Sequence, residues 1–229
     1  TPFPLLAPSL LSSISLIYWF GNQGMAKDFW RALGFDSIYG APGIVLAECF
    51  AAFPHALMIL VTALTLADAR LYEAADALGT GTVRKFFTIT LPGAKYGLIS
   101  AALVSFTLVV TDFGIPKVVG GNFNMLATDV FKLVIGQQDF QRGAVVALLL
   151  LTPAALTFAI DHVVQRKQTS TLTARAVALV PKRTRGFDFA MTLYCILIVA
   201  LMLAMFLMAV FASFATLWPY NLAPSLTHY

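Results

Sequence analysis

Four long apolar stretches set what this chain can fold into. They run from Gly43 to Leu66, from Ala94 to Phe113, from Gly143 to Val164 and from Phe187 to Ala212. Each is close to the roughly 20 apolar residues with which an α-helix crosses the hydrocarbon core of a bilayer. The stretches are continuous, whereas the strands of a membrane barrel alternate between apolar and polar residues. We therefore expect an all-α, polytopic bundle of transmembrane helices.

The composition agrees with an integral membrane protein. Hydrophobic residues make up 59% of the 229 residues and charged residues only 11%, with a mean hydropathy of +0.81. A soluble domain has roughly 25% charged residues. The net charge of +4 comes from basic residues beside the apolar stretches. Nucleic-acid binding would instead need basic residues interleaved with exposed aromatic ones. We expect contact with membrane lipid and none with nucleic acid.

One polar segment separates the first two apolar stretches, and it covers residues 68–92. Its apolar residues up to Leu78 have helical spacing, and Gly79 follows at once, which predicts a helix that ends in a left-handed turn. Thr82 is expected to cap a second helix. Pro92 is expected to end that helix or to start the next membrane segment. The segment is therefore predicted to be a helix, a tight turn and a second helix.

The same segment carries a pattern by which this chain resembles a known family. Glu73, Ala74 and Ala75, followed by Gly79, Ile89, Leu91 and Pro92, are similar in type and spacing to the EAA signature of inner-membrane permeases of binding-protein-dependent ABC importers. The resemblance implies the type I permease fold, docking of the segment into a cleft of a cytoplasmic ATP-binding subunit that works as a dimer, and a periplasmic substrate-binding protein. A solvated loop helix would explain each residue but not the whole spacing. The resemblance also implies that these seven residues couple the permease to the ATPase.

A second pattern narrows the resemblance to one branch of the family. Residues 111–116, TDFGIP, with Gly120, Gly121 and Thr128, are similar to the outer-loop pattern of ferric-iron, polyamine and 2-aminoethylphosphonate permeases. The resemblance favours 2-aminoethylphosphonate as the substrate, with ferric iron or a polyamine as the alternatives. Thr128 is also expected to cap a helix.

The resemblance also predicts how the chain is divided. Residues 1–165 correspond to the later part of a first permease unit, and residues 166–186 to a basic cytoplasmic linker. Residues 187–229 are placed like the first span of a second permease unit fused in the same chain. We therefore expect this chain to be an excerpt of a longer protein.

The basic residues predict an orientation without the motif. When the loops are assigned alternately to the two sides, ten of the fifteen Lys and Arg residues fall on the side of segments 68–92 and 166–186. The more basic side of a membrane protein faces the cytoplasm. We expect a multi-pass protein of the bacterial inner membrane with both segments in the cytoplasm.

Three of the ionisable residues within or at the end of the apolar stretches are candidates for function. Glu48 and His55 are seven residues apart in the first stretch and thus on one helical face, and Asp112 ends the second stretch. An ionisable group in hydrocarbon costs free energy unless it faces protein or water. We take these residues as candidates for the translocation path. Alternatively, Glu48 and His55 satisfy each other or nearby backbone groups, and Asp112 caps a helix end.

The sequence predicts no catalytic residue, cofactor or metal site. It has no phosphate-binding glycine loop with Lys and Ser or Thr, and its three histidines are too dispersed for a metal cluster. We expect a transport subunit whose ATP is hydrolysed by a partner. A proton-coupled secondary transporter that uses Glu48 and His55, or a membrane scaffold, is less favoured because neither needs an ATPase dock.

Overall fold

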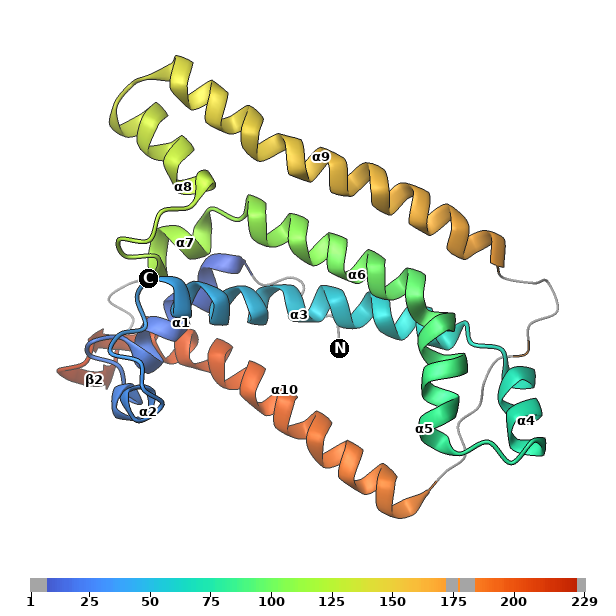
Figure 1. Cartoon of the computed structure of the whole chain (residues 1–229). Helices are drawn as coiled ribbons and strands as arrows, with labels where there is room; N and C mark the ends of the chain where they lie inside the picture. Colours follow the sequence, from blue (N-terminus) through green and yellow to red (C-terminus); the bar gives the residue numbers. More distant parts are fainter. Residues whose placement is uncertain (1–7, 172–176, 178–183, 226–229) are drawn as a thin grey trace. The chain divides into compact units, whose positions relative to one another are not determined.

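The computed structural model describes residues 8–171, 177 and 184–225, except for the side chains of residues 167–171. The fold is essentially all-α, as the apolar stretches predicted (Figure 1). Among the described residues, four helical runs are long and apolar enough to cross a membrane. They are α3 (Ala41–Thr65), the run Thr82–Thr111 that ends in α6 (Leu91–Thr111), α9 (Phe140–Thr171) and α10 (Arg185–Phe214).

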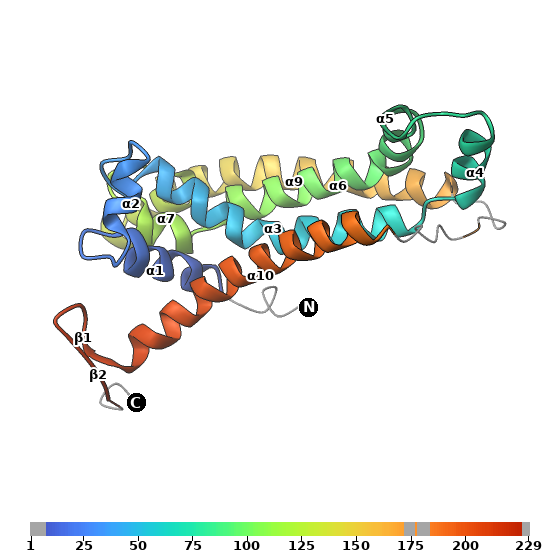
Figure 2. The same ribbon diagram turned by 90° about the horizontal axis from the view of Figure 1, so that it is seen from below.

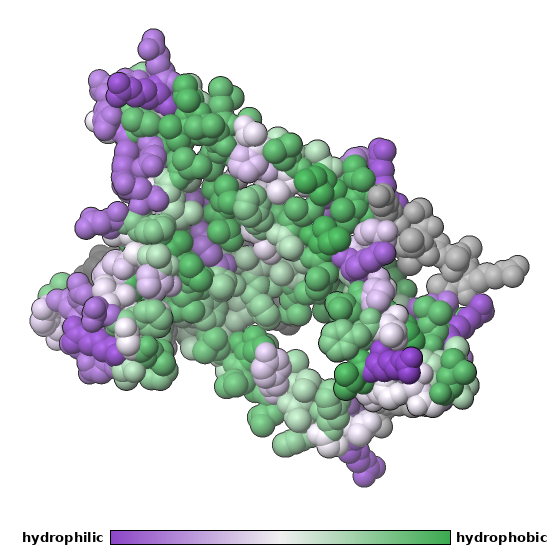
Figure 3. Space-filling view, viewed as in Figure 1, coloured by the Kyte–Doolittle hydropathy of each residue, from purple (hydrophilic) through white to green (hydrophobic). Residues whose placement is uncertain are grey.

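Hydrophobic residues cover the middle of α9, and hydrophilic residues gather towards its ends (Figure 3). Leu148, Leu156 and Phe158 on this helix are each more than half exposed. Such side chains are stable beside lipid tails, which are as apolar as they are. The exposed apolar surface of α9 is therefore that of a helix that faces lipid.

The chain forms two compact units, and the first combines three separate segments of the sequence. It comprises Thr1–Ala51, Thr111–Leu148 and Arg185–Tyr229. Besides parts of the long helices, the first unit contains α1 (Ser9–Phe20), α2 (Lys27–Ala32), α7 (Gly114–Val119), α8 (Leu126–Phe131), η3 (Lys132–Gly136), β1 (Ala215–Leu217) and β2 (Asn221–Pro224). In it, α1 contacts both α7 and α10, and Figure 2 shows α1 beside α10.

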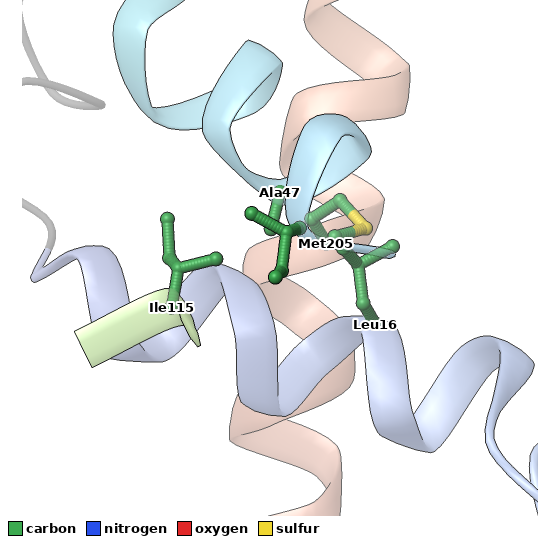
Figure 4. Close-up of a cluster of buried hydrophobic side chains, with 5 residues drawn as sticks. Leu16, Ala47, Ile115 and Met205 are labelled. Atoms are coloured by element: carbon green, nitrogen blue, oxygen red, sulfur yellow. The ribbon is translucent and has the colours of Figure 1, made fainter. Parts of the chain in front are cut away.

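One cluster of apolar side chains holds the first unit together. Leu16 of α1, Ala47 of α3, Ile115 of α7 and Met205 of α10 meet in it (Figure 4), and Leu16 and Ile115 are fully buried. Ile44 completes the cluster. Because lipid tails are as apolar as these side chains, close packing rather than exclusion from water keeps the helices together. The cluster fixes the face of α3 that carries Glu48.

Two details of the first unit differ from the sequence prediction. β1 and β2 form a short antiparallel hairpin after α10, the exception to the all-α fold (Figure 2). The helix expected to be capped by Thr128 begins earlier, at Leu126. Thr128 is its third residue, and its hydroxyl bonds back to the backbone of Met125, accepting from N at 3.1 Å and donating to O at 2.8 Å. Thr128 thus contributes to the cap from inside the helix.

The second unit comprises Ala52–Val110 and Leu149–Thr184. It contains the later part of α3, α4 (Ala69–Ala77), α5 (Thr82–Lys85), the π-helical stretch η2 (Phe86–Thr90), α6 and the later part of α9. Gly97 of α6 packs directly on Ala63 of α3, since a Cβ built at Gly97 would lie 2.2 Å from the Ala63 Cβ. A small residue in a membrane helix allows such close approach of two backbones.

The basic linker predicted at residues 166–186 lies largely outside the described residues. Val177 is described. Its carbonyl accepts a hydrogen bond of 2.9 Å from the Ala69 amide, and its own amide lies 3.4 Å from Oδ1 of Asp68. This residue of the predicted linker therefore contacts the beginning of α4.

Candidate functional site

The predicted coupling segment begins with α4, and both ends of this helix have their backbone groups satisfied. At its start, Oδ1 of Asp68 accepts a hydrogen bond of 3.1 Å from the Arg70 amide. At its end, the Thr80 amide donates to the Ala75 carbonyl at 2.9 Å, and the Gly79 amide donates to the Asp76 carbonyl at 3.0 Å. These are the two bonds of a Schellman motif.

Gly79 makes this turn possible. Its φ is +67°, a left-handed conformation that glycine adopts without the steric cost of a Cβ. The prediction that the helix ends at a left-handed Gly79 is confirmed.

The second helix differs from the prediction at both ends. Gly81, and not Thr82, is the N-cap, and Thr82 is the first helical residue. Pro92 does not end the helix, because one continuous run extends from Thr82 to Thr111. The π-helical stretch Phe86–Thr90 lies directly before α6, so the helix is widened where the proline ring would otherwise meet the preceding turn. The tight turn is therefore joined to a membrane span without a break.

Two side-chain contacts fasten α4 to the helix that follows it. The hydroxyls of Tyr72 and Thr90 lie 2.8 Å apart and share a hydrogen bond. Lys85 forms an ion pair with Asp76. We call α4 and the helix that begins with α5 the helix pair, and its membrane-side end the base. The Tyr72–Thr90 contact lies near the base and the Asp76–Lys85 contact lies near the turn, so the two helices are held as one body.

The signature residues fall into two groups. Glu73 and Ala74 are exposed on α4, Ala75 is buried, and Gly79 forms the exposed turn. The remaining three, Ile89, Leu91 and Pro92, lie where η2 passes into α6. The structure thus places the first group along α4 and in the turn that follows it, and the second group around the start of α6.

Large apolar side chains point outward around the turn. Leu78 is 83% exposed, Val83 73% and Phe87 61%. Exposed apolar residues next to a rigid turn, on a segment too polar to cross the membrane, are typical of a surface that binds another protein. The hydrophobic pattern of the sequence did not predict that Val83 and Phe87 contribute to this exposed apolar surface, because they do not belong to the periodic face of either helix.

The two carboxylates proposed for the translocation path, Glu48 and Asp112, both lie in the first unit. Glu48 is 5% exposed, and its Oε1 has no hydrogen-bond partner among the described residues. Asp112 is half-buried. Its Oδ1 accepts from the Ser9 hydroxyl at 2.8 Å, and its Oδ2 accepts from the Ile115 amide at 2.7 Å. Asp112 therefore stabilises the start of α7, as the helix-capping alternative predicted, whereas Glu48 remains a buried carboxylate that could serve a ligand.

His55 lies further along α3, in the second unit, where its side chain is half-buried. Sequence reasoning treated Glu48 and His55 as one pair, and the structure assigns them to different units. Asp161 lies within α9 and accepts a hydrogen bond from Ser100 of α6. Periodicity alone offered no signal for this partner or for Ser9, because each lies far from its carboxylate along the chain.

Comparison with known proteins gives a consistent result. Residues 2–170 match the family model described as the inner membrane component of binding-protein-dependent transport systems. The chain is 27% identical over 164 residues to the ferric transport system permease protein FbpB of Actinobacillus pleuropneumoniae, covering 69% of this chain and 24% of that protein. It is 30% identical over 120 residues to the molybdenum transport system permease protein ModB of Azotobacter vinelandii, covering 52% of this chain and 53% of that protein.

A third relative is the spermidine/putrescine transport system permease protein PotC homolog of Mycoplasma genitalium. It is 29% identical over 131 residues, which are 57% of this chain and 43% of that protein. The chain thus spans about a quarter of the ferric relative and about half of the other two.

Proposed function

Because this chain belongs to the family of inner membrane components of binding-protein-dependent transport systems, we propose that it is a permease subunit of an ABC importer. In this proposal it contributes membrane spans to a substrate path. A partner subunit, acting as a dimer, binds and hydrolyses the ATP, and the chain itself is not an enzyme. A soluble binding protein delivers the substrate to the opposite side.

The observation that carries the proposal is the capped turn at Gly79 with apolar side chains exposed on either side of it. Leu78 and Val83 flank the turn and are the most exposed apolar residues of the helix pair. The ATPase would bury them in a cleft, and the signature residues of small volume, Ala74 and Ala75, would allow close approach.

The continuous helix from Thr82 to Thr111 supports a mechanical coupling. The contacts Tyr72–Thr90 and Asp76–Lys85 hold α4 against this helix, so a displacement of the turn is passed to α6. Closure of the ATPase dimer would then move α6 and the spans packed on it, as in other rigid-body transitions. The close approach of Gly97 to Ala63 is one such packing contact along α6.

Replacing Gly79 by Val tests this role. Valine at a left-handed φ is strained, at a cost of roughly 1–3 kcal/mol. We expect the turn to be displaced, so that transport falls while the chain still inserts. Gly81→Val is the matched control, because Gly81 has φ −67° and ψ 157°, which a β-branched residue adopts readily. ATPase co-purification and substrate uptake are the readouts. Normal assembly and uptake by the Gly79→Val transporter would refute the docking role.

The substrate that we propose is 2-aminoethylphosphonate, with ferric iron or a polyamine as the alternative. The TDFGIP pattern of residues 111–116 supports this branch. The buried carboxylate of Glu48 also supports a ligand with a cationic group, which all three candidates share. An oxyanion without a cationic group would be repelled by the same carboxylate.

Uptake by cells that carry the complete operon decides among these substrates. Labelled 2-aminoethylphosphonate, ferric iron and putrescine are offered separately, and cells without the permease gene are the control. Accumulation of iron alone would refute the phosphonate assignment and leave the transporter class intact. If none of the three accumulates and molybdate is taken up instead, the proposed role of Glu48 in attracting a cationic group is also refuted.

The proposal includes how the chain is divided into permease units and how it is oriented in the membrane. Residues 187–229 would begin a second permease unit fused to the first, and the segments 68–92 and 166–186 would lie in the cytoplasm of a bacterial cell. A second EAA signature in the longer reading frame is the expected result. Without one, the fused arrangement is wrong.

A further inference from the structure

A pocket of about 300 Å³ lies in the second unit, between the end of α3, the start of α4 and the start of α6. Its volume is at the lower end of the range typical of small-molecule sites. The exposed apolar residues Leu78 and Val83 at the turn do not line it, although the signature residues Ile89 and Pro92 do. A ligand can therefore occupy the pocket while the ATPase binds the turn.

The depth of the pocket follows from two observations. The apolar span α3 ends at Thr65, and polar residues begin at Asp68. Gly97 of α6 packs on Ala63 of α3, so Lys95, two residues before Gly97, lies near the level at which α3 ends. Lys and Tyr residues are enriched at this level of a membrane protein, where lipid headgroups meet the protein. The pocket therefore lies at headgroup depth.

The pocket wall carries charges of both signs. Lys95 is exposed, and its Nζ lies 4.9 Å from the centroid of the Tyr96 ring, within cation–π distance. Asp68 contributes a carboxylate, which can accept several hydrogen bonds in addition to those it receives from the backbone. An ammonium group for a phosphate and a carboxylate for an amine together complement a zwitterionic phosphate ester.

The surroundings of the charged groups are apolar. Leu64, Leu66 and Leu71 line the same pocket and are 43%, 40% and 57% exposed. A small soluble zwitterion would leave these side chains uncovered. The acyl chains that a phospholipid carries on its glycerol would cover them.

We propose that this pocket binds the headgroup of phosphatidylethanolamine, with the phosphate at Lys95 and the primary amine at Asp68. The lipid would lie against the base of the helix pair α4–α5, next to Tyr72 and Thr90, and would help to set the position of the coupling turn. The assignment does not depend on which solute the protein transports.

Lipid retention by the purified transporter tests the proposal. The complete complex is reconstituted with phosphatidylethanolamine, phosphatidylglycerol or phosphatidylcholine, and bound lipid is counted by native mass spectrometry after detergent exchange. We expect wild-type protein to retain phosphatidylethanolamine, and Lys95→Gln to retain about tenfold less, as the loss of a charge-assisted phosphate contact predicts. Arg70→Gln is the matched control, because Arg70 is an exposed basic residue of α4 outside the pocket. It should retain wild-type levels.

Asp68→Asn separates the two halves of the headgroup site. Asparagine still caps α4 but lacks the charge that attracts an amine. We expect this variant to lose the preference for phosphatidylethanolamine over phosphatidylglycerol. The total amount of bound lipid should stay within about twofold of the wild-type amount. Equal retention by wild type and Lys95→Gln, or equal retention of all three lipids by wild type, would overturn the proposal. Displacement of the lipid by free 2-aminoethylphosphonate at millimolar concentration would also overturn it, in favour of a soluble ligand.

Discussion

Ser100 on α6 donates a hydrogen bond of 2.5 Å to Oδ1 of Asp161 on α9. The hydroxyls of Thr107 and Thr157 lie 2.8 Å apart and form a second link between the same two helices. The partner number on α9 falls as the residue number on α6 rises, so the helices are antiparallel. Polar links of this kind in hydrocarbon are worth about 0.6–1.7 kcal/mol each. They hold α9 against the helix that continues from the coupling turn.

The first prediction follows from this link. Ser100→Ala and Asp161→Ala should each lower the stability of the second unit by about 1 kcal/mol or more. Their effects should not add fully, because both remove the hydrogen bond between Ser100 and Asp161, although Asp161→Ala also removes the bond that Asp161 accepts from Gln165. Thermal unfolding of the purified protein in detergent, with the double variant included, measures the coupling. Ser105→Ala is the control, since Ser105 lies on a different face of α6. Fully additive effects would contradict the link.

The second prediction compares two glycines on α6, four residues apart. A Cβ at Gly97 would lie 2.2 Å from the Ala63 Cβ, whereas a Cβ at Gly93 would meet no atom within 4 Å. Gly97→Ala should therefore separate α3 from α6 and cost about 1–3 kcal/mol. Gly93→Ala should be neutral or slightly stabilising, because alanine favours the helix. The yield of folded protein after detergent extraction and its unfolding temperature are the measurements. Similar values for both variants would mean that α3 and α6 do not approach so closely.

The contacts Gly97–Ala63 and Ser100–Asp161 also show which features of the fold could be predicted from the sequence. Hydropathy predicted the spans, because length and continuity of apolar residues are local properties. Gly79 could be predicted as a left-handed turn for the same reason, since the helix signals and the glycine are adjacent. The partners of Gly97 and Ser100 lie 34 and 61 residues away. Periodicity gives the face of a helix and not the helix that covers it, so neither contact could be predicted.

Pro92 illustrates a different limit. Its missing amide and its ring suggested a helix boundary, and the structure instead has a π-helical stretch, Phe86–Thr90, directly before α6. A π-helical stretch of five residues is too short to be recognised from hydrophobic spacing, which is read over windows of about 11–18 residues. α6 begins at Leu91, so Pro92 does lie at the start of a membrane helix, but neither alternative predicted that this helix continues from α5 without a break. The proposed transmission depends on that continuity.

The third prediction concerns Glu48. Its buried Oε1 has no partner within the described part of the chain, so the side chain adds little to the stability of the first unit. We expect Glu48→Leu to be at least as stable as wild type, because replacing a buried unpaired carboxylate by an apolar side chain relieves its desolvation. Uptake of the cationic or zwitterionic substrate should nevertheless fall about tenfold or more.

Unfolding temperature and uptake in proteoliposomes separate these effects. Asp188→Leu is the control, because Asp188 is an exposed carboxylate near the start of α10. A Glu48→Leu protein that is stable and transports at the wild-type rate would remove Glu48 from the path. A large loss of stability would mean that Glu48 has a structural role instead.

The last prediction tests the orientation from which the cytoplasmic docking was inferred. Thr80 lies in the coupling turn before α6, and Asn122 lies in the loop after α7, so one membrane crossing separates them. Cysteine at position 80 should react with a membrane-impermeant maleimide only after the cytoplasmic side is opened. Cysteine at position 122, an exposed residue, should react in intact spheroplasts. Both exposed native cysteines, Cys49 and Cys195, must first be replaced by Ser so that they do not add to the signal. The reverse pattern of labelling would place the coupling turn outside the cell, where no ATPase could reach it, and would refute the proposed docking.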